Sequence, residues 1–200
     1  MGKEKYQKDI ESLFNKSPVV SFSSISRIIK KEKRFKQYQK QLIRNLLSKG
    51  KIKKLAKGYY TIHNDPSLIV LCFKPGYLGL QAALSSHNLW EQETIPIIIT
   101  TRKVRSGIRK IIGMNVLIRR IDKKYLFGFD YFKDGEFWLP YSDKEKTLID
   151  MVYFKEKLSK EALKNLIKNI DRKKLNLYLK IYPESVGKAV RTLITRKNHY

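Results

Sequence analysis

Cysteine is almost absent from this sequence: Cys72 is the single one among 200 residues, so no internal disulfide can form. Cys72 lies in the apolar segment 68–73, where a small buried hydrophobic residue is more typical than a reactive nucleophile. No run of about 18 apolar residues occurs, which argues against a membrane-spanning helix. The N-terminal segment has charges spread through it and no apolar signal core. We therefore expect a cytoplasmic protein with no membrane partner.

The usual catalytic motifs are also missing. The sequence has no phosphate-cradling glycine loop, no nucleophile elbow and no cluster of cysteines and histidines. Asp130, Asp134 and Glu136 could suggest the metal site of a nuclease, because converging carboxylates bind divalent cations. A turn explains Asp134 better, however, and alternation along an exposed strand explains Glu136 better. We expect no enzymatic activity, no cofactor and no bound metal, with a nuclease as the competing possibility.

Acidic residues are scarce relative to basic ones. The chain has 43 Lys and Arg against 18 Asp and Glu, a formal net charge of +25 and a pI near 10.0. Residues 1–65 hold 17 basic and 5 acidic residues, and residues 66–200 hold 26 and 13, so the first third is more basic per residue. This balance indicates a polyanionic partner, nucleic acid first or an acidic protein second. A Lys-rich composition can also reflect genome bias or a hot habitat.

Residues 34–62 carry the clearest pattern in the chain. Apolar side chains recur there at spacings of three and four, which predicts a helix that starts at Phe35 and is ended by Gly50. Its apolar face comprises Phe35, Tyr38, Leu42, Ile43, Leu46 and Leu47. Its opposite, polar face comprises Gln37, Lys40, Gln41, Arg44 and Ser48. Two short strands, 52–55 and 59–62, then flank Ala56-Lys57-Gly58, where Gly58 supplies the positive φ of a tight hairpin.

The segments before this helix complete a DNA-binding arrangement. We expect a first helix over 5–14, a short strand over 19–22, and a second helix over 24–31 with Ser23 or Ser24 as its N-cap. Three helices followed by a two-stranded hairpin make a winged helix-turn-helix, whose third helix enters the major groove. Asn64-Asp65-Pro66 then marks a boundary. The sequence thus predicts a winged-helix DNA-binding domain over residues 1–65.

The polar face predicts how DNA is bound. Gln37, Gln41 and Arg44 are candidates for base edges, because Gln pairs with adenine and Arg with guanine through two hydrogen bonds. Phosphate contacts need only a point charge, and we expect them from Lys36, Lys40, Lys53, Lys54 and Lys57. The competing interpretation is an ordinary solvated surface helix, because basic amphipathic helices are common and non-specific.

Residues 66–200 predict a second domain with a small sheet. Segment 67–73 is compatible with a helix or a strand, and 80–86 with a short apolar helix. Branched side chains predict strands over 95–101 and 116–121, separated by a basic connector over 102–110. Asp134-Gly135 predicts a hairpin between 127–132 and 136–139, which Pro140 ends.

The last third of the chain has helical periodicity. Ser142 and Glu145 have the spacing of a capping box, which predicts a helix start there. Further helices are expected from Ser159, around Leu175 to Tyr182, and from Pro183. The predicted fold class is therefore α+β: an N-terminal winged helix-turn-helix followed by a mixed domain with a small sheet and C-terminal helices.

Three blocks of this sequence resemble the AbiEi-type antitoxins of type IV toxin–antitoxin systems. The first is Leu55 to Tyr60, which is similar to that family's basic-glycine-x-tyrosine wing. The second, Tyr77 to Leu89 (YLGLQAALSSHNL), resembles its YxSLxSALxxHGL block and is followed by a strand and Thr101-Arg102. The third comprises Phe127-Gly128 and Lys144 to Tyr153 (KEKTLIDMVY), which resemble its FG and PEKALLDLLY blocks. Order and spacing agree over about residues 20–155, with Gly79 where the family usually has serine.

The resemblance implies a two-part antitoxin associated with abortive infection. Its winged helix represses its own operon by binding double-stranded DNA repeats in the promoter, and its C-terminal domain, residues 66–200, neutralises a nucleotidyltransferase-like toxin. Antitoxin and toxin in this class need not form a stable complex. The alternative is a winged-helix transcriptional regulator whose C-terminal domain senses a ligand or mediates dimerisation.

Overall fold

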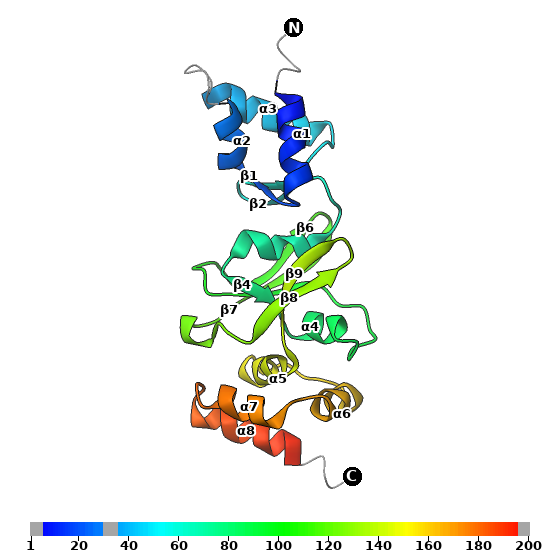
Figure 1. The fold of residues 1–200 in the computed structure, drawn as a ribbon, viewed down its shortest axis with the longest axis vertical. Helices are drawn as coiled ribbons and strands as arrows, with labels where there is room; N and C mark the ends of the chain where they lie inside the picture. Colours follow the sequence, from blue (N-terminus) through cyan, green and yellow to red (C-terminus); the bar gives the residue numbers. More distant parts are fainter. Residues whose placement is uncertain (1–5, 30–35, 196–200) are drawn as a thin grey trace. The chain divides into compact units, whose positions relative to one another are not determined.

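The computed structural model describes residues 6–29 and 36–195, which form an α+β protein (Figure 1). The chain divides into two compact units: residues 1–72 with 110–114, and residues 73–109 with 115–200. The predicted domain boundary after residue 65 stays a prediction, because the first division in the structure falls after Cys72. No helix in the described residues combines the length and apolar character needed to cross a membrane.

The first unit is a winged helix-turn-helix. Its elements are α1 (Gln7–Lys16), β1 (Val20–Ser21), α2 (Phe22–Ile29), α3 (Lys36–Ser48), β2 (Lys53–Ala56) and β3 (Tyr59–Thr61). The three strands form an antiparallel sheet in the order β1-β3-β2. Gly50 ends α3 at φ +65° and Gly58 closes the hairpin at φ +78°, as the sequence predicts.

The core of the first unit comes from the apolar faces of the three helices and from the hairpin. The buried members are Ile10, Phe14, Val20, Ile25, Ile29, Ile43, Leu46, Ile52 and Tyr60. The predicted N-cap of α2 was wrong: the hydroxyl of Ser21, not that of Ser23 or Ser24, accepts a hydrogen bond from the Ser24 amide at 3.1 Å. The helix starts earlier than predicted because β1 ends at Ser21 and Phe22 follows it directly.

The second unit is built on a six-stranded mixed sheet with the order β6-β7-β5-β4-β9-β8, apart from residues 110–114 at the β6–β7 turn, which are grouped with the first unit. The strands are β4 (Gly76–Leu78), β5 (Ile97–Thr100), β6 (Gly107–Ile111), β7 (Met114–Arg120), β8 (Phe129–Asp134) and β9 (Phe137–Ser142). Strand β5 runs parallel to β7 and antiparallel to β4, while β4 runs parallel to β9. The 3-10 helix η1 (Pro66–Phe73) precedes the sheet, and η2 (Lys123–Tyr125) follows β7.

The remaining elements of the second unit are helices, which pack on the sheet or on one another. They are α4 (Gln81–Ser86), α5 (Lys144–Tyr153), α6 (Lys160–Lys168), α7 (Arg172–Leu179) and α8 (Glu184–Thr195). Figure 1 shows α5 between the sheet and the pair α7 and α8. Leu148 and Ile149 of α5 are almost wholly buried there, in one core cluster with Leu80, Ile99 and Leu175.

Several predictions for the second unit were wrong in detail. Strand β4 was not predicted, and the basic connector over 102–110 contains most of β6. Pro140 does not end the hairpin, because β9 continues to Ser142 and pairs with β4 only at Tyr141, beyond the proline. Ser142 is therefore a strand residue, and the N-cap of α5 is Asp143, whose carboxylate accepts from the Lys146 amide at 2.7 Å.

Gly128 occupies a position that no larger residue fits. Its φ is +68°, and an added Cβ would lie 2.9 Å from Cβ of Lys146 and 2.9 Å from Cε2 of Tyr178. The chain thus enters β8 pressed against α5 and α7. Gly135, in the β8–β9 turn, has a similar φ of +55° but nothing within 4 Å of an added Cβ.

Alanine substitutions at these two glycines separate the cost of backbone strain from the cost of side-chain overpacking. We expect Gly135→Ala to cost about 1–2 kcal/mol of unfolding free energy, because it introduces only the strain of the left-handed conformation. Gly128→Ala should cost about 1–3 kcal/mol more, because it also overpacks α5 and α7. Urea unfolding followed by tryptophan fluorescence measures both, since Trp90 and Trp138 lie in the second unit. Equal losses for the two variants would contradict the packing around Gly128.

Candidate functional site

The outward face of α3 is polar and basic. Lys40, Gln41, Arg44 and Ser48 are exposed, as predicted, while Ile43 and Leu46 are buried in the core. The helix has this orientation because its apolar stripe can leave water only against α1 and α2. The backbone of Lys36 and Gln37 begins α3, but the predicted roles of these two side chains lie outside what the structure describes.

A buried polar contact joins α2 to α3. The hydroxyl of Ser26 donates to Oε1 of Gln39 at 3.1 Å, and Nε2 of Gln39 lies 3.5 Å from the Ser26 carbonyl oxygen. Both side chains are about 7% exposed. A buried amide without a partner is costly, so this pair favours one crossing of α2 over α3. That crossing sets the direction in which Lys40 and Arg44 project.

Asn45 belongs to this face although the sequence pattern did not single it out. It is exposed, and its Oδ1 accepts a hydrogen bond from Nε2 of Gln41 at 3.0 Å, one helical turn away. The two amides therefore form an ordered pair with donors and acceptors directed outward. The spacing of four residues from Gln41 was the signal that could have identified Asn45.

The β2–β3 hairpin is short and tied to the helices. The Phe22 amide donates to the Gly58 carbonyl oxygen at 2.7 Å, so the turn is held against the start of α2. Lys54 and Lys57 are exposed on the hairpin. Lys53 is half-buried, and its ammonium donates to Oδ1 of Asn64. Lys54 and Lys57 are thus available to a ligand, whereas Lys53 is partly engaged within the unit.

The segment that supplies this surface contains no acidic residue. Residues 36–64 contain eight Lys and Arg and no Asp or Glu. Within the part of the chain that the structure describes, no ion pair involves Lys40, Arg44, Lys54 or Lys57. Without an ion-pair partner in this described part, these charges favour the approach of a polyanion. We call the exposed side chains of α3 and the hairpin the α3 face.

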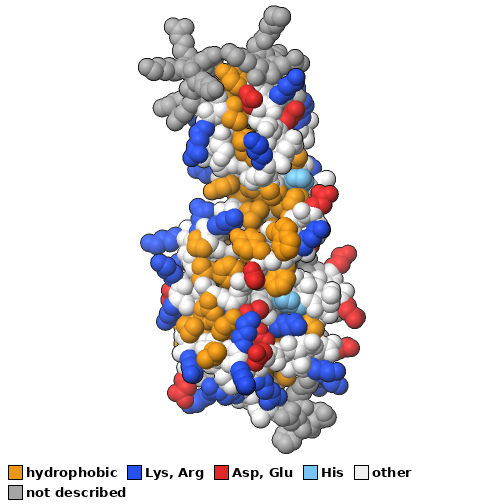
Figure 2. Space-filling model, in the orientation of Figure 1, with side chains coloured by type: hydrophobic (Ala, Val, Ile, Leu, Met, Phe, Trp, Pro, Cys, Tyr) orange, Lys and Arg blue, Asp and Glu red, His pale blue; other side chains and the backbone are white. Residues whose placement is uncertain are grey.

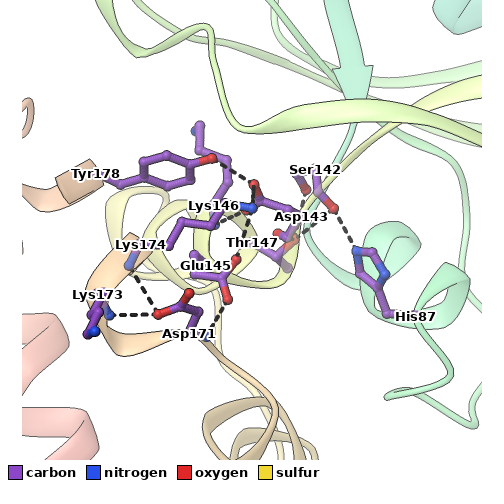
Figure 3. Close-up of polar contacts among 10 residues, drawn as sticks. All are labelled: His87, Ser142, Asp143, Glu145, Lys146, Thr147, Asp171, Lys173, Lys174 and Tyr178. Atoms are coloured by element: carbon purple, nitrogen blue, oxygen red, sulfur yellow. Dashed lines mark hydrogen bonds and ion pairs between the residues drawn. The ribbon is translucent and has the colours of Figure 1, made fainter. Parts of the chain in front are cut away.

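A second polar cluster surrounds the start of α5 (Figure 3). Besides capping α5, the Asp143 carboxylate accepts from the Tyr178 hydroxyl and pairs with Nζ of Lys174, both at 2.9 Å. Oε1 of Glu145 accepts from the Asp171 amide at 2.6 Å. These contacts fasten α7 onto α5. Each carboxylate is engaged by protein donors, so the cluster is a structural clamp.

The clamp also reaches α4. Nε2 of His87, the residue that ends α4, donates to the Ser142 carbonyl oxygen at 2.8 Å. The Ser142 hydroxyl lies 2.8 Å from the hydroxyl of Thr147, so the end of β9, α4 and α5 are joined. His87 thus acts as a helix-end residue. Within the described residues, no group of three or more His, Cys, Asp or Glu is placed to hold a metal ion.

The pKa shifts in this cluster follow from burial and from Asp143. Burial, and then the hydrogen bond to Asp143, raise the pKa of Tyr178 to about 12. For Lys174, burial acts to lower the pKa, but the hydrogen bond and the charge of Asp143 outweigh it and the pKa is raised. Tyr178 is therefore a neutral donor and Lys174 a fixed cation at neutral pH.

A fully buried ion pair lies behind the clamp. Nζ of Lys146 pairs with Oδ1 of Asp150 one turn along α5, and neither side chain is exposed. The Tyr77 hydroxyl of β4 donates to Oδ2 of Asp150 at 2.7 Å, and Nζ of Lys146 donates to the Tyr182 hydroxyl at 2.9 Å. The ammonium also lies 5.2 Å from the centre of the Tyr77 ring. The pair thus connects the sheet, α5 and the segment before α8.

Burial shifts the pKa values of the groups around this pair. It lowers the pKa of Lys146, which the charge of Asp150 opposes, and it raises the pKa of Asp150, which Lys146 opposes. Burial, followed by the charge of Asp150, also raises the pKa values of Tyr77 and Tyr182. Each charge is thus sustained by its partner and by tyrosine hydroxyl groups, not by water.

Comparison with solved structures shows that the fold occurs elsewhere. The chain is similar to the crystal structure of the RV2827C protein from Mycobacterium tuberculosis, with a TM-score of 0.63 and 13% sequence identity over 95% of this chain and 76% of that one. At this identity the likeness shows the fold alone. Searches of family models and of curated proteins found no match.

The buried pair predicts a non-additive pattern of stability. Lys146→Met should cost about 3–5 kcal/mol of unfolding free energy, because it leaves Asp150 buried without its cation. The double variant Lys146→Met/Asp150→Leu should be less destabilised than Lys146→Met alone, because no uncompensated charge is left. Urea unfolding monitored by tryptophan fluorescence measures this. Losses that simply add would show that the two groups do not act as a pair.

Proposed function

We propose that this protein is a DNA-binding antitoxin that represses its own operon. The α3 face binds repeats in the promoter as double-stranded DNA, and the second unit neutralises a nucleotidyltransferase-like toxin. The proposal places the protein in the cytoplasm, assigns it no enzymatic activity, and does not require a stable complex between antitoxin and toxin.

The observation that supports DNA binding is the α3 face, whose cations Lys40, Arg44, Lys54 and Lys57 have no ion-pair partner among the described residues. A helix that projects Arg44, Lys40 and the Gln41–Asn45 amide pair offers the donors and acceptors that read base edges in the major groove. Lys54 and Lys57 on the hairpin lie within the same unit and need only a phosphate oxygen as partner. Because the buried Ser26–Gln39 contact fixes α3 against α2, α3 presents these side chains in one orientation.

The antitoxin part of the proposal is supported by the resemblance and by where its blocks lie. Tyr77 from the second block donates to Asp150 from the third, and Gly128 packs on Lys146, also from the third. Residues of the second and third blocks thus share one buried assembly within the second unit, whereas the first block, Leu55 to Tyr60, lies in the first unit. They support a common framework, on which residues at the surface contribute the neutralising function.

A cavity in the second unit favours the alternative of a ligand-sensing regulator. It measures about 560 Å³ and lies among α5, α6 and α8. Its lining combines apolar residues such as Leu148, Met151 and Leu163 with the charged Lys155, Glu156 and Lys157. That volume is within the range of small-molecule sites. Under this alternative, an apolar ligand would change operator binding, and no neighbouring toxin gene would be required.

DNA binding predicts different effects for two substitutions. Arg44→Ala should cost about 1–3 kcal/mol of binding free energy on the operator and relax specificity, because it removes a base contact. Lys54→Ala should weaken binding to operator and random duplexes alike, because a phosphate contact carries no sequence information. Fluorescence anisotropy with both duplexes measures the effects, with Lys8→Ala, an exposed lysine of α1, as the charge-matched control. Equal losses for Arg44→Ala on both duplexes would contradict base reading.

The antitoxin role predicts that neutralisation needs the second unit and not the α3 face. Cells that express the neighbouring toxin should be rescued by the full chain and by full-length Arg44→Ala/Lys54→Ala. A chain truncated after residue 72 should fail to rescue them. Growth on induction of the toxin measures this, with immunoblotting to confirm equal protein levels. Rescue by the truncated chain would overturn the assignment of neutralisation to the second unit.

A further inference from the structure

The second unit carries a basic surface of its own, formed by residues outside the clamp and the buried ion pair. Residues 101–124 contain nine Lys and Arg and a single acid, Asp122. The sequence pattern alone predicted a basic connector over 102–110 and a strand over 116–121 in this segment. Figure 2 shows Lys and Arg side chains along the left side of the molecule, at the level where Figure 1 labels β7.

The sheet brings two basic segments to the same edge. Strands β5 and β7 are parallel and in register, with Ile99 opposite Arg119 and Thr100 opposite Arg120. The Ile121 amide donates to the Thr100 carbonyl oxygen at 3.0 Å, so the chains leave the two strands side by side. Because parallel strands end at the same edge, the loop after β5 and the loop after β7 are neighbours.

Together these loops present a cluster of cations. The exposed side chains are Arg102, Lys103 and Arg105 after β5, and Arg120, Lys123 and Lys124 at the end of β7 and beyond it. The acid within this cluster, Asp122, is engaged locally, because its Oδ1 accepts from the Lys123 amide at 2.9 Å. The nearby Arg119 points elsewhere, since its guanidinium pairs with Glu156. We call these six cations the β5/β7 edge.

The loop after β5 is held in one conformation. The hydroxyl of Thr100, which is wholly buried, accepts from the Arg102 amide at 3.1 Å and lies 2.7 Å from the Phe73 carbonyl oxygen. The guanidinium of Arg109 donates to the Arg105 carbonyl oxygen at 2.8 Å. A basic loop fixed in this way loses little conformational entropy when it binds an anion.

We propose that the β5/β7 edge is a second contact surface for duplex DNA, which holds its phosphate backbone. Six cations around one local acid complement a row of phosphates. No aromatic residue occurs in 101–124, and Tyr125, whose ring Lys124 contacts, is buried, so these segments offer no exposed ring on which single-stranded bases stack. The edge thus contributes affinity without sequence preference. This inference deepens the proposed function and rests on duplex DNA as the ligand.

The test is the salt dependence of binding by the full-length chain to a random duplex. The edge variant is Lys103→Ala/Arg120→Ala/Lys123→Ala, and the control variant is Lys168→Ala/Lys173→Ala/Lys180→Ala, which removes equal charge from exposed positions on α6, at the start of α7 and just after it. The slope of log Kobs against log salt concentration should become shallower by about 0.9 for each phosphate that the edge variant no longer neutralises. The control variant should keep the wild-type slope. Circular dichroism and tryptophan fluorescence confirm that both variants fold.

The outcomes separate the inference from the proposed function. Equal slopes for the edge and control variants would overturn the inference and leave operator reading by the α3 face untouched. A larger loss on a single strand than on a duplex, or weaker binding to polyglutamate with DNA binding unchanged, would also overturn it. If Arg44→Ala leaves operator specificity intact while the edge variant has a shallower slope, the proposed base reading fails and the phosphate contact stands.

Discussion

The excess of positive charge constrains which side chains of this protein can be buried and which must lie at the surface. With 43 basic and 18 acidic residues, most cations have no carboxylate to pair with. A cation taken out of water without a partner costs several kcal/mol or shifts its pKa, so the surplus has to lie at the surface. Among the described residues one lysine, Lys146, is buried, and it is enclosed by Asp150, two tyrosines and the faces of aromatic rings.

The surface charge is ordered by the packing beneath it. In the first unit, burial of the apolar stripe of α3 leaves Lys40, Gln41 and Arg44 outside, and the Ser26–Gln39 contact fixes the angle at which they project. In the second unit, the parallel pairing of β5 with β7 gathers two basic loops at one edge. Residues 36–64 contain no acid and residues 101–124 contain one, Asp122, so positive charge dominates both surfaces, which suits a polyanion.

The buried side of the second unit has a different role. The Lys146–Asp150 pair, the Asp143 cap and the close approach at Gly128 hold β4, β9, α5 and α7 in one arrangement. Gly128, Lys146 and Asp150 belong to the blocks that resemble the AbiEi-type antitoxins, whereas Asp143 lies just before the third block. A buried polar group that lacks part of its hydrogen bonds destabilises the fold. These contacts therefore favour the one packing of the helices on the sheet in which all of them form. Sequence likeness to that family thus falls mainly on residues that maintain the framework.

Patterns of nearest neighbours along the chain were enough to predict the winged helix, the hairpin turns at Gly58 and Asp134-Gly135, and the exposed face of α3. Periodicity and turn chemistry act over a few residues, so they can be read from the sequence alone.

Other features were not predicted: strands β4 and β6, the cap at Asp143, the exposed Asn45 with its partner Gln41, and the meeting of two basic loops. They depend on which distant segments pair: β9 runs on to Ser142 because it lies between β8 and β4, and Tyr77 meets Asp150 only once the sheet is covered by α5. Local sequence therefore determined the elements of the winged helix, whereas contacts between remote segments decided where the second unit places its charges.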